Sequence, residues 1–267
     1  MQPPYPAQTL LIEGTDAIAF AHAQFSSQVI SLAVDRWQFS AWLDPQGRVR
    51  ALFHLGRLAD DRLLLLLRGG RASTMADALR RYVFRSRVSL TAMPPRSLAT
   101  GPASPLHELR AEGDAFSFGC GAHTLLITTE GDGDNAWRLP QMHMGWPWLP
   151  ESRLNELLPP TLSLQRLHAA AIDKGCYPGQ EIVARLHYRG GSKRHLHGVQ
   201  LSQPALPGEA LQVDGREIGC LLDVIQHEDG IDALAVLHDE AVSQARDGRL
   251  DVFENMEGIR LRTAWPA

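Results

Sequence analysis

Cysteine and lysine are both scarce in this sequence, and the scarcity of cysteine argues against a disulfide-rich or cysteine-ligated class of protein. The three cysteines, Cys120, Cys176 and Cys220, form no CxxC pair and no framework typical of a secreted disulfide-rich domain. We therefore expect free thiols in a reducing cytoplasm and no cysteine-based metal centre. The segment Glu130 to Asn135 resembles a calcium loop only in part, because it lacks the closing glutamate, so a plain turn is expected there.

Long apolar runs and a basic leader are also missing. The longest apolar run, Leu63 to Leu67, is far too short to span a bilayer. The opening residues, Met1 to Pro6, lack the basic-then-apolar pattern of a signal peptide. With a net charge of −4, the chain has no general attraction to nucleic acid or membranes. These features predict a soluble cytoplasmic protein.

The two lysines, Lys174 and Lys193, both fall in one basic segment, and arginine supplies the other cations. Between residues 174 and 197, a single carboxylate, that of Glu181, accompanies five cations: Lys174, Arg185, Arg189, Lys193 and Arg194. One concentrated basic stretch in an acidic protein favours an anionic ligand at that place. A solvated charged turn would give the same pattern.

The amino-terminal two thirds mixes helix and strand signals in an order typical of α+β proteins. Thr15 and Asp16 predict the start of a helix, and Ser73 predicts the start of a second helix that runs through Tyr82 and Val83. Strands are predicted at 36–43, 48–55, 62–68 and 125–127, the first two joined by a turn at 44–47. The Trp- and Met-rich stretch 137–150 indicates a core segment or an aromatic pocket.

From about residue 196 the pattern changes to short strands separated by turns. Strands are predicted at 196–201, 210–213, 217–224, 233–237 and 259–263, with Asp214-Gly215 as a hairpin turn. This spacing predicts a small C-terminal β-barrel or sandwich. We expect a domain boundary that separates residues 1–192 from residues 193–267.

The most informative motif is Lys174-Gly175-Cys176-Tyr177-Pro178-Gly179-Gln180-Glu181. Its glycines and proline predict a loop, and a helix is expected to begin near Pro178 or Gly179. A helix N-terminus and a nearby ammonium, which Lys174 could supply, both favour thiolate over thiol at Cys176. The alternative is that Cys176 is a small buried hydrophobe, as most lone cysteines are. Cys120 and Cys220 are better explained by packing.

The block from Asp173 to Arg185, continued by Tyr188 to Arg194, resembles the signature of the YgfZ-like family in the superfamily of the glycine cleavage aminomethyltransferase (T-protein). The segment Gly14-Thr15-Asp16 and the turn Asp44 to Val49 resemble further landmarks of that family. The resemblance implies two interlocked α+β, ferredoxin-like subdomains and a C-terminal β-barrel.

Family members bind tetrahydrofolate and support iron–sulfur enzymes, including those that methylthiolate tRNA, so the resemblance implies tetrahydrofolate or a derivative as the cofactor. Trp137 is expected to stack on the pterin, although core packing would also explain this residue. Lys174 and Cys176 are the expected chemical groups. The expected folate contacts are Trp137, Tyr177, Gln180, Glu181, Arg185 and Arg194.

Two other functions remain open. A folate-dependent one-carbon transferase is disfavoured because Arg48-Val49-Arg50-Ala51 stands where the aminomethyltransferase has acidic residues. An RNA-binding module based on residues 185–197 is disfavoured because one basic stretch rarely gives enough surface. We therefore predict an accessory factor whose partners are folate and iron–sulfur proteins, without direct tRNA contact.

Overall fold

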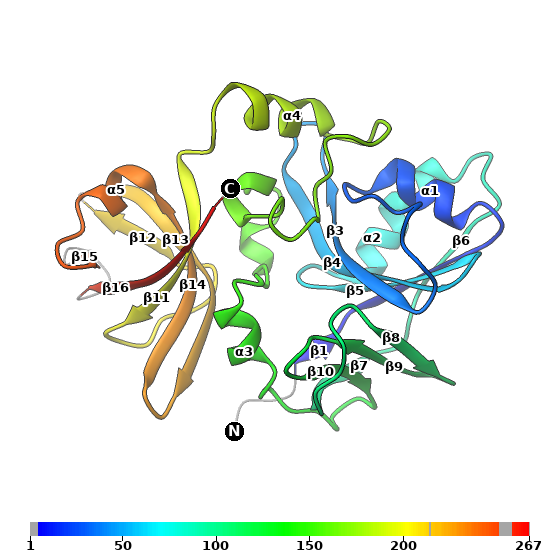
Figure 1. The fold of residues 1–267 in the computed structure, drawn as a ribbon, viewed down its shortest axis with the longest axis horizontal. Coiled ribbons are helices and arrows are strands. Elements are labelled where there is room, and N and C mark those ends of the chain that lie inside the picture. Colours follow the sequence, from blue (N-terminus) through cyan, green and yellow to red (C-terminus); the bar gives the residue numbers. More distant parts are fainter. Residues whose placement is uncertain (1–4, 214, 251–257, 267) are drawn as a thin grey trace. The chain divides into compact units, whose positions relative to one another are not determined.

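The computed structural model describes residues 5–213, 215–250 and 258–266 (Figure 1). The chain divides into two compact units. Unit 1 comprises Met1–Leu43, Arg50–Arg138 and His168–Pro178, and unit 2 comprises Asp44–Val49, Leu139–Leu167 and Gly179–Ala267. Each unit therefore draws on segments that are far apart in the sequence, and the chain passes from unit 1 to unit 2 between Pro178 and Gly179, within the 174–181 motif.

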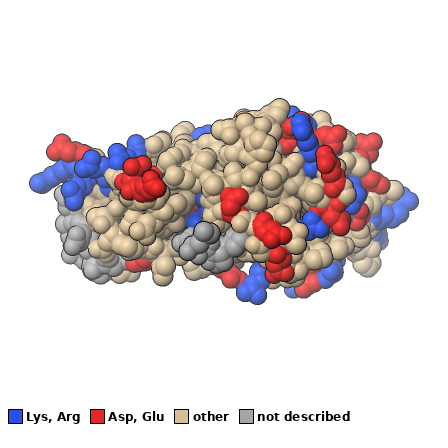
Figure 2. Space-filling view, turned by 90° about the horizontal axis from the view of Figure 1, so that it is seen from below, with Lys and Arg blue, Asp and Glu red and all other residues tan. Residues whose placement is uncertain are grey.

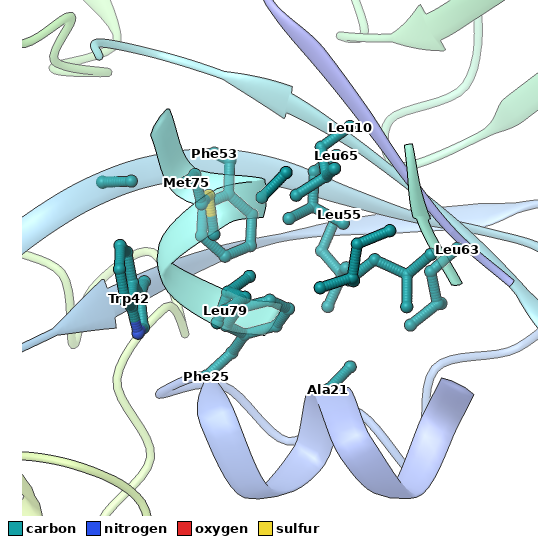
Figure 3. Packing of buried hydrophobic residues seen from close by; sticks show 14 of the residues in the cluster. Leu10, Ala21, Phe25, Trp42, Phe53, Leu55, Leu63, Leu65, Met75 and Leu79 are labelled. Carbon is teal, nitrogen blue, oxygen red and sulfur yellow. The ribbon is translucent and has the colours of Figure 1, made fainter. Parts of the chain in front are cut away.

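The first sheet of unit 1 has the strand order β3-β4-β5-β2-β6. Its strands are β2 (Thr9–Glu13), β3 (Arg36–Leu43), β4 (Val49–Ala59), β5 (Arg62–Leu67) and β6 (Ser89–Ala92). Helices α1 (Ala17–Gln24) and α2 (Ala72–Leu79) pack their buried residues against it in one hydrophobic cluster (Figure 3). Phe25, Phe53 and Leu65 are among the members of this cluster that have no solvent exposure.

The second sheet of unit 1 has the order β1-β7-β10-β9-β8. Its strands are β1 (Pro6–Ala7), β7 (Arg96–Gly101), β8 (Leu109–Glu112), β9 (Ala115–Gly119) and β10 (Thr124–Thr128). Buried Trp37 stacks on His54 with ring centroids 4.3 Å apart and donates its indole N–H to the carbonyl oxygen of Gly119 (2.9 Å). Because Trp37 lies on β3, this hydrogen bond ties the two sheets together.

Unit 2 contains a six-stranded antiparallel sheet, curled as Figure 1 shows, in the order β12-β13-β14-β11-β16-β15. Its strands are β11 (Arg194–Leu201), β12 (Ala210–Val213), β13 (Arg216–His227), β14 (Gly230–His238), β15 (Arg249–Leu250) and β16 (Ile259–Trp265).

The other helices of the described residues are α3 (Arg138–His143), α4 (Gln180–Arg189) and α5 (Asp239–Ser243). Short 3-10 turns lie at Arg80–Tyr82, Glu151–Arg153 and Pro159–Leu162.

Most predicted elements are confirmed, and the fold is a mixed α/β fold with several sheets. The helix after Asp16 begins at Ala17, the hairpin around 44–47 is present, and each predicted C-terminal strand is found. Val213 pairs with Arg216 across the predicted hairpin turn. Asp214 itself lies outside the described residues.

The prediction for the second helix of unit 1 was wrong at both ends. Ser73 does not cap it, because the helix begins at Ala72, whose N–H is bound by the side-chain oxygen of Gln8 (3.1 Å). The α-helix also ends at Leu79, and a 3-10 turn at Arg80–Tyr82 follows. Tyr82 consequently leaves the apolar face and is half exposed, whereas Val83 packs on the core.

Among the helices of the described chain, none combines the length and the apolar character that a membrane crossing requires.

Candidate functional site: the cysteine loop

The three cysteines differ sharply in their surroundings. Cys176 is exposed, whereas Cys120 and Cys220 are buried. The Cys120 thiol donates to the carbonyl oxygen of Phe118 (3.3 Å), and burial raises the pKa of Cys220 to about 11. The prediction that Cys120 and Cys220 serve packing is therefore confirmed. Because it is exposed, Cys176 is the thiol through which the folded chain can react.

Lys174 anchors the loop on which Cys176 lies. Its ammonium donates to the backbone carbonyl oxygens of His22 (2.6 Å), Phe25 (2.6 Å) and Ser27 (2.9 Å). These carbonyls lie at and just beyond the C-terminal end of α1, where the helix dipole favours a cation. The side chain is buried, and this burial lowers the pKa of Lys174 to about 8. The geometry therefore gives Lys174 an anchoring position.

The carbonyls that receive Lys174 belong to a segment that is itself held by buried serines. The Ser26 hydroxyl donates to the carbonyl oxygen of Ala169 (2.5 Å) and accepts the N–H of Ala41 (3.0 Å). The Ser27 hydroxyl lies 2.7 Å from that of Ser40 on β3. The N–H of Ala171 also binds the carbonyl oxygen of Ser26 (2.8 Å). Short hydroxyl side chains thus connect the end of α1, strand β3 and the chain that leads into the loop.

Tyr177 is buried beside the same ammonium. The Nζ atom of Lys174 lies 5.0 Å from the centroid of the Tyr177 ring, within the range of a cation–π interaction. The phenol donates to the carbonyl oxygen of Ala171 (2.7 Å), and burial raises its pKa to about 12. Residues 174 and 177 therefore fasten the loop on either side of Cys176.

Gly179 sets the start of α4, as the motif predicts. It has φ +81 and stands at the N-cap position. A Cβ atom there would lie 2.5 Å from the carbonyl oxygen of Asp44 and 2.7 Å from the Cα of Gly47. The tip of the β3–β4 hairpin thus presses directly on the backbone at residue 179. Only glycine satisfies both the left-handed backbone and this contact.

His22 is a neighbour of the loop that the sequence does not reveal. Its Nε2 atom lies 4.0 Å from the position that a Cβ atom of Gly175 would take, and its buried Nδ1 has no hydrogen-bond partner among the described residues. Burial, reinforced by the positive charge of Lys174, lowers the pKa of His22. A neutral imidazole therefore lies beside the residue that precedes Cys176.

Trp137 has no solvent-exposed surface in the structure. Its indole N–H donates to the carbonyl oxygen of Asp134 (3.0 Å), and its backbone N–H binds the hydroxyl of Thr100 (2.8 Å). Tyr5 packs edge-on against the ring with centroids 5.8 Å apart. Trp137 is therefore built into the core of unit 1.

The remaining predicted contacts lie in unit 2. Gln180 and Glu181 form the first turn of α4, and Arg185 is exposed one turn further along the helix. Arg194 begins β11. Together with Lys193 and Arg216 it lines a pocket of about 490 Å³, and carboxylates also line this pocket (Glu156, Asp239 and Glu240). Basic and acidic side chains are also mixed on the face drawn in Figure 2. On this face, an anion would therefore depend on local groups rather than on an extended positive field.

The structure thus brings Lys174, Tyr177 and His22 together around the backbone that carries Cys176, all within unit 1. Trp137 belongs to unit 1 as well, where it packs with Tyr5 and Asp134. Gln180, Glu181, Arg185 and Arg194 belong to unit 2.

Comparison with known proteins supplies a fold class. Aminomethyltransferase T of the glycine cleavage system from Bartonella henselae superposes with a TM-score of 0.69, covering 96% of this chain and 83% of that structure at 15% identity. At 15% identity, this similarity is evidence for a shared fold and for nothing more specific. The chain therefore has an aminomethyltransferase-like fold.

The sequence relatives are more specific. A tRNA-modifying protein YgfZ from Sodalis glossinidius is 26% identical over 92% of this chain and 86% of its own length. Its counterpart from Aliivibrio fischeri (strain MJ11) is 27% identical over 84% and 80%. An uncharacterized protein of Haemophilus influenzae is 28% identical over 91% and 90%. No model of a known protein family matches the sequence. Along most of its length the chain is therefore similar to YgfZ tRNA-modifying proteins, and it shares its fold with the aminomethyltransferase.

Replacing Lys174 by methionine should lower the free energy of unfolding by about 3 kcal/mol, because three buried carbonyls lose their donor. The loss should also depend on pH. The pKa of Lys174 is about 8 in the folded chain, so as the pH rises its ammonium loses a proton at a lower pH in the folded chain than in the unfolded chain. The free energy of unfolding of the wild type therefore rises relative to that of Lys174→Met as the pH increases from about 8 to about 10. Urea unfolding at several pH values measures both effects.

The matched control is Lys193→Met, which removes the other lysine of the chain from an exposed position. This variant should stay within about 0.5 kcal/mol of the wild type. Equal effects of the two substitutions would contradict the anchoring position of Lys174.

Replacing Gly179 by alanine should destabilise the chain by roughly 2 kcal/mol or more, because the new methyl group meets backbone atoms in a left-handed conformation. Gly191→Ala is the control, since nothing lies within 4 Å of a Cβ at that position and its φ is not in the left-handed range. Thermal unfolding of both variants measures the difference. A Gly179→Ala protein as stable as Gly191→Ala would show that the contact with the hairpin tip is absent.

Proposed function

We propose that the chain is a folate-binding accessory protein that supports iron–sulfur enzymes and tRNA modification in the cytoplasm. The observation that carries the proposal is an exposed thiol on an anchored loop, in a chain whose relatives are tRNA-modifying proteins. The finer architecture, two interlocked ferredoxin-like subdomains and a C-terminal barrel within the boundaries 1–192 and 193–267, is part of the same proposal.

Cys176 is the group through which the protein acts. One thiolate cannot hold an iron–sulfur cluster, which usually has four such ligands. Any contact with a cluster is therefore shared with a partner protein, folate or a small thiol. His22, kept neutral by burial and by Lys174, lies beside Gly175, the residue that precedes Cys176.

The cationic residues suit the glutamate tail of tetrahydrofolate. Arg185 is exposed on α4 and Arg194 lines a pocket with Lys193, so guanidinium groups are available to carboxylates. Trp137 is fully buried, so any contribution of this residue to folate binding would come through packing. Tyr177, also buried, would act through the loop backbone, and Gln180 and Glu181 would complete the polar contacts at the start of α4. Bound folate would supply one-carbon and redox chemistry.

The second candidate is a folate-dependent one-carbon transferase, which the aminomethyltransferase-like fold favours. Against it, Arg50 occupies the region where the aminomethyltransferase has acidic residues, and its guanidinium lies 3.8 Å from the ring centroid of Trp42. A guanidinium in that position cannot act as a general base. A steady-state assay for methylene transfer from an amine donor separates the two functions, because an accessory factor gives no turnover.

Calorimetry with tetrahydrofolate tests the cofactor. The wild type should bind, Arg185→Gln/Arg194→Gln should bind about tenfold more weakly because charge-assisted hydrogen bonds to the tail are lost, and Cys176→Ala should bind like the wild type. A wild type that does not bind would remove folate from the proposal, and an unchanged double variant would place the tail elsewhere.

Methylthiolated tRNA in cells tests the role of the thiol. In cells that depend on this chain, Cys176→Ala should lower the methylthiolated fraction of tRNA to the level of a deletion, whereas Cys120→Ala should leave it unchanged. Liquid chromatography with mass spectrometry of tRNA digests measures that fraction. A Cys176→Ala chain with full function would show that the loop acts without its thiol.

A further inference from the structure

The segment between α2 and β6, residues 80–87, presents aromatic and basic side chains to solvent. Phe84 is 89% exposed, the largest value among the large hydrophobic side chains of the described chain, and Tyr82 is 51% exposed. The segment reads Arg80-Arg81-Tyr82-Val83-Phe84-Arg85-Ser86-Arg87 and contains no carboxylate. We call these residues the 80–87 surface.

The fold holds the 80–87 surface in a defined shape. Leu79 is a member of the hydrophobic cluster that also contains the buried residues of α2, and Val83 packs against this cluster. These contacts attach the segment to the core. The N–H of Val83 binds the carbonyl oxygen of Arg80 (3.2 Å), and the N–H of Ser86 binds that of Val83 (2.9 Å). The N–H of Arg87 binds the carboxylate of Asp16 (2.7 Å). Exposure of Phe84 is therefore a property of an anchored turn.

The four arginines of this surface divide into an outer and an inner pair. The outer two have acidic neighbours, since Arg80 forms an ion pair with Asp77 and Arg87 lies 4.0 Å from Asp16. The inner two, Arg81 and Arg85, are exposed and form no ion pair among the described residues. The guanidinium carbon of Arg85 lies 5.9 Å from the centroid of the Phe84 ring, within cation–π range. The positive charge beside the exposed ring is thus not neutralised.

We propose that the 80–87 surface binds a single-stranded segment of RNA directly. Unstacked bases stack on exposed aromatic rings, and arginines beside the rings meet the phosphates. The absence of carboxylates between residues 80 and 87 favours a polyanion over a mixed protein surface. This inference goes beyond the proposed function, because it replaces the expectation of no direct tRNA contact. That expectation considered the basic stretch 185–197 alone.

The experiment measures binding of a fluorescently labelled uridine oligonucleotide, and of unfractionated tRNA as its competitor, by anisotropy over a series of salt concentrations. Phe84→Ala should weaken binding about fivefold or more at every salt concentration, because one stacking platform is lost. Arg81→Gln/Arg85→Gln should instead reduce the slope of log affinity against log salt by about 1.4, since each phosphate contact on a single strand contributes about 0.7.

Two matched controls accompany these variants. Leu206→Ala removes a 73% exposed apolar side chain from unit 2, and Arg110→Gln removes an exposed arginine that pairs with Glu108. Both variants should bind RNA like the wild type. Cys176→Ala should do so too, because the proposed RNA contact does not involve the thiol. Thermal unfolding verifies that every variant is folded.

Two results would overturn the proposal. One is a wild type that does not bind either RNA at low salt, or that binds with the same affinity after Phe84→Ala. The other is equally tight binding of poly-glutamate that competes with the oligonucleotide and also depends on Phe84, because the surface would then fit an acidic protein partner.

Discussion

The buried ammonium of Lys174 is the contact on which the candidate site depends. Three backbone carbonyls at and beyond the end of α1 receive it, and the ring of Tyr177 lies beside it. A charge removed from water in this way is tolerated only where several oriented acceptors replace the lost hydration. The segment 25–27 supplies them because Ser26 and Ser27 hold its backbone in place against β3 and the chain at Ala169. Anchoring is therefore shared between residues that the sequence keeps far apart.

This anchoring explains why one cysteine differs from the other two. Residues 174 and 177 are fixed by buried contacts. Gly179 is the N-cap of α4, and its backbone packs closely against Asp44 and Gly47 at the tip of the β3–β4 hairpin. Cys176 lies between these fixed points and remains exposed, whereas Cys120 and Cys220 are buried. A thiol presented by a fixed loop can meet a partner protein without a large loss of conformational entropy.

The sequence predicted the parts of the fold that depend on local signals. Alternation predicted the strands, and the glycine at 179 predicted the start of α4, because these signals lie within the elements themselves. Ser73 failed as a cap because Gln8, distant in sequence, binds the N–H of Ala72. Tyr82 failed as a core residue because the helix tightens to a 3-10 turn after Leu79.

The candidate site was predictable as a motif but not as a geometry. The motif indicated an important thiol, yet it suggested that Lys174 could activate Cys176 directly, whereas the structure places its ammonium on three carbonyls. His22 was missed because no spacing rule connects a residue of α1 with a loop 152 positions later. Phe84 and its arginines were missed because exposure of an aromatic side chain is a tertiary property that periodicity does not report.

The fold presents Cys176, and not the other cysteines, from an anchored loop. Mass-spectrometric mapping of thiol alkylation in the native protein tests this difference between the cysteines. We expect rapid modification of Cys176, with Cys120 and Cys220 protected until the chain is unfolded in denaturant. Native protection of Cys176 equal to that of Cys120 would show instead that the loop buries the thiol on which the proposed function depends.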